Sequence, residues 1–462
     1  MSLAVVSNRL TIPGHASPPG GLAVGVLSAL RQSGGVWLGW SGKTHERPAS
    51  EPESAADIES IEKEGIRFVA LDLPREQFEA YYDGFCNSTL WPLHHYFVGA
   101  FRYDAAEFDA YMAINRLYAT AVMREISPGD SIWVHDYQLM PLAALLRERG
   151  VQGRLGFFLH IPYPTIALLR ALPVYAELVR DLCQYDLVGF QTSEDLEGFH
   201  SAVHSVFHDQ AVIGADHIEL AGRRVRTGVF PIGVDVEAVA TQAADAVRED
   251  EQVKRLLAGL LGRKFMLGVD RLDYSKGLVE RFASYRTLLE SSPELLGNVA
   301  LIQIAPLSRV NVAAYVDIRD ALEHAAGRTN GQYADTDWTP VRYLNRDFRH
   351  DTLCGFLRVA NVAVVTPLRD GMNLVAKEFV AAQDPQDPGV LVLSRMAGAA
   401  RELTEALLVN PYDRKAVARA LSLALAMPLD ERRSRHAAML EVLRKNSIAA
   451  WYGGFIDRLE QP

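Results

Sequence analysis

The segment VVTPLRDGMNLVAKEFVAAQ (residues 364–383) joins a predicted buried strand to a predicted helix. Valines mark the strand at 361–366, and the helix carries an apolar stripe made of Leu374, Val375, Phe379 and Val380. The turn RDGMN (369–373) between them holds two opposite charges and a glycine, which is more than a connection requires. Asp370 can project from the end of the strand, and Gly371 permits close approach of a ligand to the backbone. Such strand–turn–helix units build doubly wound α/β folds.

The same alternation of short apolar runs and amphipathic patterns continues along nearly the whole chain. Predicted strands lie at 3–7, 36–40, 131–136, 154–160, 186–191, 226–231, 264–270, 299–305, 341–344, 361–366 and 390–394. Predicted helices include 137–149, 167–183, 277–291, 311–325 and 413–426. Eleven strands with helices between them are too many for one typical open sheet and favour two parallel sheets, each covered on both faces.

The domain boundary is predicted near PIGVDVEAV (231–239), after which a charged, alanine-rich stretch precedes the next strand. The two domains are therefore expected to span 1–235 and 236–445. A terminal helix with a glycine break is expected within 446–462, and the polar segment 41–60 is expected to be a mobile loop.

Composition narrows the class of protein. The chain has 462 residues, is 49% apolar and carries a formal net charge of −10. This charge argues against a nucleic-acid surface, and no uninterrupted run of 18 apolar residues indicates a membrane span. Three cysteines lie far apart without CxxC spacing, and Met1 leads directly into a strand rather than a secretory signal. These features predict a reduced, cytoplasmic protein without a zinc site.

Polar residues follow several of the predicted strands. Arg9 ends the first strand, and Gly21 lies in a glycine pair before a helix, where backbone amides suit an anion. His135 and Asp136 follow the strand at 131–136, although Asp136 can also act as a simple helix N-cap. His160 follows another strand, and a lone histidine in such a place is more often structural than catalytic. No GxGxxG motif with an acidic ribose clamp is present, which disfavours NAD binding.

The segment LGVDRLDYSKGL (267–278) places Arg271 and Lys276 in a short loop before a helix. Two cations at a helix N-terminus suit a diphosphate, with arginine as a fork and lysine as a point charge. The alternative is that both pair with Asp270 and Asp273 on the surface. Glu378, one turn beyond Leu374, could accept hydrogen bonds from hydroxyls beyond an anion. Groups suited to a sugar, a phosphate and a ribose thus follow one another, which indicates a binding site for a nucleotide-sugar.

Taken together, these motifs resemble glycosyltransferase family 20, the trehalose-6-phosphate synthases, over essentially the whole chain. The segments that carry the resemblance are VVSNRL, GGLAVGVL, GWSG, YYDGFCNSTLWP, WVHDYQLMPLA, GFFLHIPYPT, LVGFQT, PIGVD, DRLDYSKGL, IQIAPLSR, GMNLVAKEFVAAQ and GVLVLSRMAGAA. The resemblance implies a GT-B fold, with two Rossmann-like domains facing a central cleft. The acceptor would bind mainly in the first domain and the donor in the second, and the terminal helix would cross back to the first.

The resemblance also implies a role for each matching residue. The catalytic residues would be Arg271, Lys276, His160 and Asp370. The donor, UDP-glucose, would be held by Gly21, Arg271, Lys276, Phe348, Asp370, Gly371, Met372, Asn373, Leu374, Val375 and Glu378. The acceptor, glucose 6-phosphate, would be held by Arg9, Tyr82, Trp91, Asp136, Tyr137 and Arg309. In these roles Phe348 would lie at the uracil and Glu378 at the ribose, while Arg9 and Arg309 would clamp the 6-phosphate.

The implied reaction is metal-independent transfer of glucose with retention, giving trehalose 6-phosphate and UDP without a cofactor. Retaining hydrolases use a carboxylate nucleophile, and no carboxylate is obviously placed for that role, so front-face transfer is expected. A different acceptor, or a non-catalytic sugar-phosphate sensor, is the alternative. The expected partners are the two substrates, another copy of the chain in a dimer or tetramer, and a separate trehalose-phosphate phosphatase, with no nucleic acid and no membrane.

Overall fold

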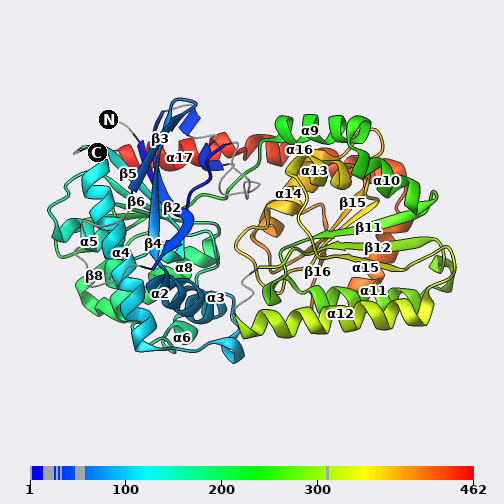
Figure 1. Ribbon diagram of the computed structural model, residues 1–462, viewed down its shortest axis with the longest axis horizontal. Coiled ribbons are helices and arrows are strands. Elements are labelled where there is room, and N and C mark those ends of the chain that lie inside the picture. The colour runs from blue at the N-terminus through cyan, green and yellow to red at the C-terminus, as the bar shows by residue number, and fades with distance from the viewer. Residues whose placement is uncertain are drawn as a thin grey trace. The chain divides into compact units, whose positions relative to one another are not determined.

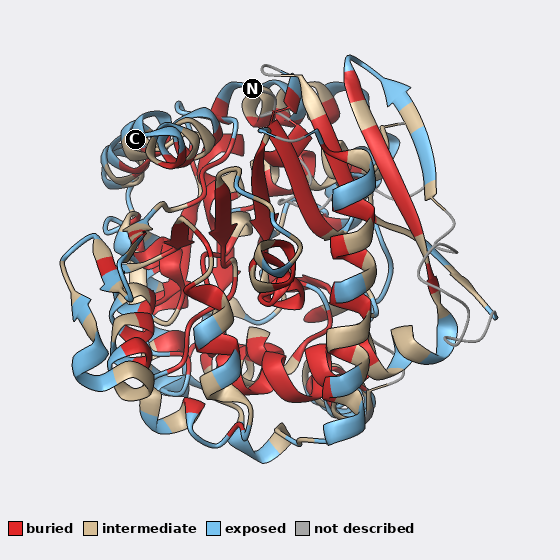
Figure 2. Cartoon of the chain, turned by 90° about the vertical axis from the view of Figure 1, so that its left-hand side faces the viewer, coloured by how far each residue is buried: buried red, intermediate tan, exposed pale blue. Residues whose placement is uncertain are grey.

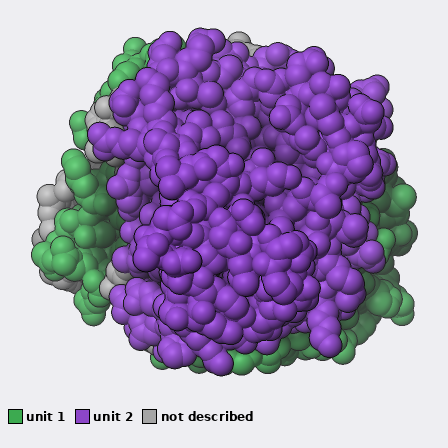
Figure 3. Space-filling model, turned by 90° about the vertical axis from the view of Figure 1, so that its right-hand side faces the viewer, with its two compact units in different colours: residues 1–231, 449–462 green, residues 232–448 purple. Residues whose placement is uncertain are grey.

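The computed structural model describes residues 3–13, 25–27, 30–31, 34–46, 58–127, 129–308 and 312–461. The chain forms two compact units, drawn as a ribbon in Figure 1 and in separate colours in Figure 3. Unit 1 comprises residues 1–231 and 449–462, and unit 2 comprises residues 232–448. Each unit has its own sheet.

The described part of unit 1 contains a ten-stranded sheet. In spatial order its strands are β3 (Ile58–Lys63), β4 (Ile66–Pro74), β2 (Gly35–His45), β1 (Leu3–Arg9), β5 (Ser131–His135), β6 (Leu155–Phe158), β7 (Leu187–Phe190), β10 (Arg223–Val229), β9 (His217–Leu220) and β8 (Ala211–Ile213). The strands from β4 to β10 are parallel, and β3, β8 and β9 pair antiparallel at the two edges. Figure 2 shows the central strands buried and β3 exposed, as its burial pattern also indicates.

The helices of unit 1 connect and cover these strands. They are α2 (Arg75–Phe78), η2 (Glu79–Leu90), α3 (Trp91–His94), η3 (Val98–Ala100), α4 (Ala105–Glu125), η4 (Tyr137–Leu139), α5 (Leu142–Glu148), α6 (Ile166–Leu169), α7 (Tyr175–Leu182), α8 (Ser193–Phe207), η5 (His208–Gln210) and α17 (Ile448–Glu460). The long helix α4 begins at Asp104, whose side chain accepts from the amide of Ala106. This is an ordinary aspartate N-cap.

Unit 2 contains, among its described residues, a six-stranded sheet in which every neighbouring pair is parallel. Its strands in spatial order are β13 (Val341–Leu344), β12 (Val299–Ile304), β11 (Lys264–Val269), β14 (Val362–Val365), β15 (Val390–Ser394) and β16 (Leu407–Val409). Counted along the chain this order is 3-2-1-4-5-6, which is that of a Rossmann sheet. The inner strands β12, β14 and β15 are entirely buried, as expected when helices cover both faces, whereas the edge strands β13 and β16 are mostly half-buried.

The helices of unit 2 form two layers, one on each face of this sheet (Figure 1). One layer contains α9 (Val236–Glu249), α10 (Glu251–Leu260), α13 (His350–Val359), α14 (Leu374–Ala382) and α16 (Leu429–Lys445). The other contains α11 (Leu278–Ser291), α12 (Ala313–Tyr333) and α15 (Arg414–Ala426). The short turns η6 (Tyr274–Lys276), η7 (Pro293–Leu295) and η8 (Gly398–Arg401) lie in the connections. The predicted fold class, with two doubly wound α/β parts, is confirmed.

All eleven predicted strands are present, but the prediction missed β3, β4, β8, β9 and β16. The edge strands β3 and β8 are poor in buried residues, which removes the apolar signal on which the prediction relied. The expectation of a mobile loop at 41–60 is wrong at both ends. β2 continues to His45 because it pairs with β4, and β3 begins at Ile58.

The predicted glycine break in the last helix is also wrong. α17 runs without interruption through Gly453 and Gly454. Its apolar residues Trp451, Phe455 and Leu459 are buried, and this packing outweighs the poor helix propensity of two glycines. Within the described ranges, no helix is long and apolar enough to cross a membrane.

Candidate functional site

The predicted site residues gather at the point in each sheet where the strand order reverses. In unit 2 this point lies between β11 and β14, whose ends lead into the loops that hold Arg271, Lys276 and Asp370. In unit 1 it lies between β1 and β5, which end at Arg9 and His135. Connections leave such neighbouring strands in opposite directions, so a crevice opens at their carboxyl ends. Each unit therefore carries candidate site residues where this topology favours ligands.

The loop after β11 is organised by Asp273, which is fully buried. One of its carboxylate oxygens accepts from the amide and the hydroxyl of Ser275, at 2.9 and 2.8 Å. The other accepts from the Tyr315 hydroxyl at 2.9 Å. Gly277 follows with a φ of 63°, and a side chain there would lie 2.3 Å from the carbonyl oxygen of Thr366. The loop is thus held tightly against the end of β14.

Arg281 on α11 lies below this loop and is 1% exposed. Its Nη1 donates to Asp270 at 2.6 Å and to Gln303 at 2.7 Å, and its Nε donates to Thr366 at 3.0 Å. Burial raises the pKa of Asp270, and the charge of Arg281 opposes that shift. One arginine therefore ties together the carboxyl ends of β11, β12 and β14, and the sequence prediction did not identify it.

The two predicted diphosphate ligands have different surroundings. Lys276 Nζ lies 2.6 Å from Asp370 Oδ2, and these side chains are 12% and 13% exposed. The Arg271 side chain is 49% exposed and reaches Asp273 only at 4.0 Å. The alternative of surface pairs with Asp270 and Asp273 does not describe Lys276, because its partner is Asp370.

The turn before α14 is shaped by Asn373, whose φ of 78° is in the left-handed region. Its Oδ1 accepts from the amide of Ala376 at 3.1 Å, and its Nδ2 donates to Asp370 Oδ2 at 3.0 Å. The amides of Leu374 and Val375, in the first turn of the helix, have no intrahelical acceptor. They are suited to an anion at the helix N-terminus.

Backbone packing holds this turn in place. The amide of Ala399 donates to the Met372 carbonyl at 2.8 Å. A side chain on Gly398 would lie 2.0 Å from the carbonyl oxygen of Gly371, so only glycine fits there. Asp370 consequently has a fixed position between Lys276 and Asn373.

Glu378 lies one turn into α14, where its Oε1 is 3.3 Å from Nε2 of His350. The pKa of His350 is raised to about 10, first by its contact with Cys354 and then by Glu378. His350 is therefore a cation beside Glu378 at neutral pH. Phe348 lies under the guanidinium of Arg346, with 4.4 Å between the Arg346 Cζ and the ring centroid.

In unit 1, Arg9 lies beside an aromatic group. Its Cζ is 5.4 Å from the centroid of the Trp40 ring, within the range of a cation–π contact. Tyr82 lies 6.4 Å from Trp40 by ring centroids. The preceding residue, Asn8, accepts from Tyr81 at its side chain and from Tyr118 at its carbonyl, at 2.7 and 2.6 Å. These bonds hold the end of β1.

A second group lies at the ends of β5 and β6. Asp136 has a φ of 74°, and its Oδ1 accepts from the amide of His160 at 3.1 Å. Trp91 and Tyr137 lie 5.8 Å apart by ring centroids. Tyr137 is 1% exposed and donates its hydroxyl to Asn87 at 2.8 Å, so its side chain supports Trp91.

The structure brings together, in unit 2, Arg271, Lys276, Asp370 and the turn that leads into α14, with Glu378 further along that helix. In unit 1 it brings Arg9 near Tyr82, and Trp91 near Tyr137. The predicted residues Gly21 and Arg309 lie outside the described residues. The prediction missed the supporting residues Asn8, Trp40, Asp273, Arg281 and His350. Asn8 and Trp40 stand inside the motifs VVSNRL and GWSG, whereas Arg281 and His350 have no local sequence signal.

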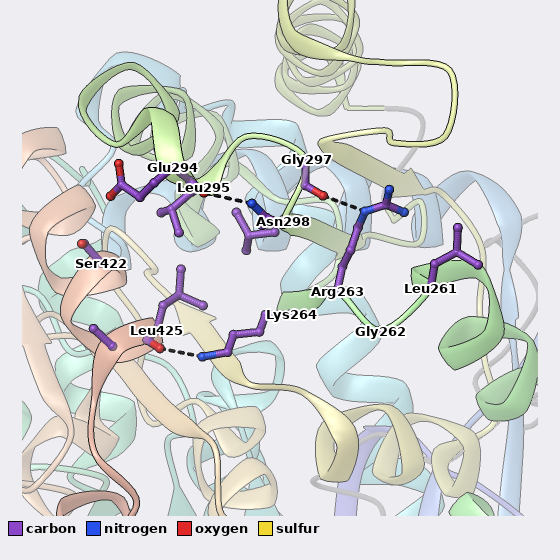
Figure 4. A pocket seen from close by; sticks show the side chains of 12 residues that line it. Leu261, Gly262, Arg263, Lys264, Glu294, Leu295, Gly297, Asn298, Ser422 and Leu425 are labelled. Carbon is purple, nitrogen blue, oxygen red and sulfur yellow. Dashed lines mark hydrogen bonds between the residues drawn. The ribbon is translucent and has the colours of Figure 1, made fainter.

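One open pocket in unit 2 lies away from this site. It has a volume of about 720 Å³ and lies at the amino ends of β11 and β12, beside Lys264 and Val299 (Figure 4). Its basic side chains are already bonded, Lys264 to the Leu425 carbonyl and Arg263 to the Gly297 carbonyl. The carboxyl ends of the strands therefore remain the better candidate for the site. No group of three or more potential metal ligands occurs in the described part of the chain.

Residues 11–461 match the model of glycosyltransferase family 20. The chain belongs to this family. A family 20 relative from Salmonella paratyphi B, a trehalose-6-phosphate synthase, is 48% identical over 459 residues, which cover 99% of this chain and 95% of the relative.

Solved structures of family 20 members agree with the fold. An alpha,alpha-trehalose-phosphate synthase (UDP-forming) from Burkholderia xenovorans, in complex with glucose-6-phosphate, matches with a TM-score of 0.95 and 44% identity, covering 100% of both chains. A structure from E. coli bound with UDP-2-fluoro glucose matches with a TM-score of 0.93 and 45% identity, covering 100% of this chain and 99% of that one. The family resemblance expected from the sequence motifs is confirmed.

Proposed function

We propose that the chain transfers the glucosyl group of UDP-glucose to glucose 6-phosphate, giving α,α-trehalose 6-phosphate and UDP. One observation carries the proposal. The loop of Arg271 and Lys276 and the turn of Asp370 and Asn373 meet at the switch point between β11 and β14. Family membership and the names of the relatives support the same reaction.

The donor half of the site is unit 2. Arg271 and Lys276 face the diphosphate together with the amides of Leu374 and Val375, because cations and helix N-termini both stabilise phosphate oxygens. In the structure Lys276 is paired with Asp370, so the diphosphate competes for that lysine. Asp370 then accepts hydrogen bonds from glucosyl hydroxyls, with Gly371, Met372 and Asn373 beside it. Glu378 binds the ribose and Phe348 lies near the uracil.

The acceptor half is unit 1. Arg9 binds the 6-phosphate and is held near Trp40. The family resemblance assigns a second phosphate contact to Arg309, which lies outside the described residues. Tyr82, Trp91 and Asp136 contact the acceptor sugar, with Tyr137 supporting Trp91. His160 and Gly21 contact the transferred glucose. Aromatic rings beside polar groups are suited to a sugar, which presents apolar and hydroxyl-bearing faces.

The transfer proceeds with retention and without a metal. The bond between the anomeric carbon of the donor and the diphosphate oxygen breaks, and a bond from the acceptor hydroxyl oxygen to that carbon forms on the same face. The acceptor proton passes to the departing diphosphate. Arg271 and Lys276 stabilise the negative charge that develops there, a contribution of about 3–4 kcal/mol each by analogy with an oxyanion donor.

The test is a coupled assay of UDP release from UDP-glucose, run with glucose 6-phosphate, with glycerol 3-phosphate and without acceptor. We expect release only with glucose 6-phosphate, together with a non-reducing disaccharide phosphate. Release with glycerol 3-phosphate instead would assign a different acceptor. Tight UDP-glucose binding without release would assign a sensor. Full activity after treatment with a chelator is expected, and its loss would contradict the metal-independent mechanism.

The proposal extends to the surroundings of the reaction. The product carries a phosphate ester, so a separate phosphatase must act if free trehalose is the end product. Cys86, Cys183 and Cys354 are buried thiols, which favours a reducing compartment such as the cytoplasm. A dimer or tetramer is expected, and light scattering of the purified chain tests it.

A further inference from the structure

Two imidazoles meet at the ends of β5 and β6. His135 Nδ1 lies 3.0 Å from His160 Nε2, and the two rings are stacked with 5.3 Å between centroids. A contact of this length between two ring nitrogens is a hydrogen bond in which one nitrogen carries the proton and the other accepts it. The histidine that donates this hydrogen bond determines which ring nitrogen of His160 carries a proton.

The surroundings of His135 determine the direction of this bond. His135 is fully buried, and no described residue forms a hydrogen bond with its other ring nitrogen, Nε2. The rings of Trp133 and Trp451 lie 4.4 and 6.2 Å from it by centroids. The indole nitrogens of both tryptophans are also buried, and neither has a partner among the residues described.

An indole nitrogen can only donate a hydrogen bond. An N–H on His135 Nε2 would therefore be a buried donor without an acceptor, and the unpartnered indole nitrogens of the two tryptophans whose rings lie beside it cannot accept from it. A lone pair on Nε2 avoids burying a donor that has no acceptor. His135 accordingly carries its proton on Nδ1.

We propose that His135 is a positioning residue for the transfer reaction, because its Nδ1–H donates to Nε2 of His160 and holds the His160 proton on Nδ1. The proposal rests on the proposed function, in which His160 contacts the transferred glucose. His160 is half-buried, and no described residue bonds to its Nδ1. That N–H is thus the group which His160 presents to a sugar hydroxyl, while Asp136 fixes the backbone of the same residue.

Both rings are neutral in this arrangement. Burial lowers the pKa of His160 to about 3, and burial together with His160 lowers the pKa of His135 well below its usual value. A second proton on this pair would place an imidazolium among aromatic rings without a carboxylate partner. The link between the two histidines is therefore a neutral hydrogen bond throughout the physiological pH range.

The test uses three variants of the full chain. His135→Leu fills the site without a donor, and His135→Asn retains an N–H near the position of Nδ1. His200→Leu is the matched control, because His200 makes one 2.9 Å bond to Thr227 elsewhere in unit 1 and has no role in the site. ¹⁵N-histidine NMR reports the tautomer of His160, whose signals are assigned by their loss in His160→Gln. Steady-state kinetics of UDP release report kcat and KM.

We expect the Nδ1–H tautomer of His160 in the wild type, in His135→Asn and in His200→Leu, and a mixture of tautomers in His135→Leu. We expect kcat to fall about 10- to 100-fold in His135→Leu with little change in KM, as for other residues that orient a reacting group. His135→Asn should recover most of the lost kcat.

An Nε2–H tautomer in the wild type would overturn the proposal. So would an unchanged tautomer and kcat in His135→Leu. If His135→Leu does not fold, the tautomer of His160 in the wild type and the kcat of His135→Asn test the proposal instead. Failure of the proposed function would be seen separately, because the wild type would then release no UDP. The NMR measurement would still test the hydrogen bond between the two histidines.

Discussion

At the scale of single residues, side chains in and beside the candidate site differ widely in burial and in their partners. Lys276 is 12% exposed and pairs with Asp370, whereas the Arg271 side chain is about half exposed. His94, beside the loop that follows β6, is 1% exposed and bonds through Nδ1 to the Pro162 carbonyl at 2.7 Å. Lys276 and His94 each lead to a separate prediction.

Replacing Lys276 with alanine should lower kcat for UDP release about 100-fold or more, because one charge facing the leaving diphosphate is lost. Lys264→Ala is the control, since Lys264 lies at the opposite end of the sheet and bonds only to the Leu425 carbonyl among the described residues. It should leave kcat unchanged. Retention of full kcat in Lys276→Ala would remove the lysine from the leaving-group role.

His94 should make stability depend on pH. Burial lowers its pKa to about 4, below the unfolded value of about 6.5. The unfolded state therefore binds more protons between these values, and stability falls as the pH falls through this window. From pH 7 to pH 5 the His94 contribution amounts to about 2 kcal/mol. His94→Asn, which keeps a donor for Pro162, should lose that part of the slope in urea unfolding at the two pH values. An identical slope would contradict the assignment.

At the scale of elements, α14 and α17 show how helix ends and helix packing serve the structure. α14 starts at a capping asparagine in the left-handed region, a conformation that asparagine and glycine adopt most readily. α17 packs against unit 1 through Trp451, Phe455 and Leu459, and Gly156 on β6 provides space for the ring of Phe455.

Two substitutions at Asn373, the N-cap of α14, distinguish the effect of backbone strain from that of a lost hydrogen bond. Asn373→Ala loses the bond to Ala376 and adds left-handed strain, whereas Asn373→Gly loses the same bond without strain. We expect the alanine variant to be less stable than the glycine variant by about 1 kcal/mol. Urea unfolding of both variants measures the difference. Equal stabilities would show that the backbone relaxes at this turn.

The glycines of α17 and of its partner strand should respond in opposite ways to alanine. Gly454 is exposed, and an added Cβ would meet no atom within 4 Å. Gly454→Ala should therefore stabilise the chain by about 0.5–1 kcal/mol. Gly156→Ala should destabilise it, because the Cβ would lie 2.8 Å from the Phe455 ring. Thermal unfolding of the two variants gives the signs, and a destabilised Gly454→Ala would contradict a continuous exposed helix.

At the scale of the whole molecule, the chain enters unit 2 at Ile232 and leaves it at Ile448. Both ends are tied to α14 through Lys377, which is fully buried. Its Nζ donates to the Ile232 carbonyl at 2.7 Å and forms an ion pair with Glu402. Glu402 in turn accepts from Asn446 at 2.7 Å. α14, the helix that follows the turn of Asp370, is thus linked to both segments through which the chain crosses between the units.

Removing one partner of the buried Lys377–Glu402 ion pair should destabilise the folded chain. Lys377→Met leaves Glu402 with an uncompensated charge and should lower the free energy of unfolding by about 3–5 kcal/mol. The double variant Lys377→Met with Glu402→Leu removes both charges and should be more stable than the single variant. Urea unfolding of the wild type, the two single variants and the double variant forms the cycle. Additive losses would contradict the coupling.

Much of the fold could be read from sequence because apolar patterning is local. The strand at 390–394 was predicted with its observed bounds, because a short uninterrupted apolar run is typical of a strand that is buried on both faces of a parallel sheet. The candidate loops at the ends of β11 and β14 were singled out because a charge directly after a buried strand is conspicuous. β8 escaped prediction because an edge strand needs no continuous apolar run, and the neighbouring β9 has only one buried residue.

The sequence by itself determined the two doubly wound sheets and the strand ends at which charged residues stand. Only the tertiary structure decided which of these residues touch. Lys276 and Asp370 are 94 positions apart, His135 and His160 are 25 apart, and Arg281 reaches three strands from one helix. Such contacts depend on strand order and register, which arise from packing between distant segments. Local patterning contains no information about those distances.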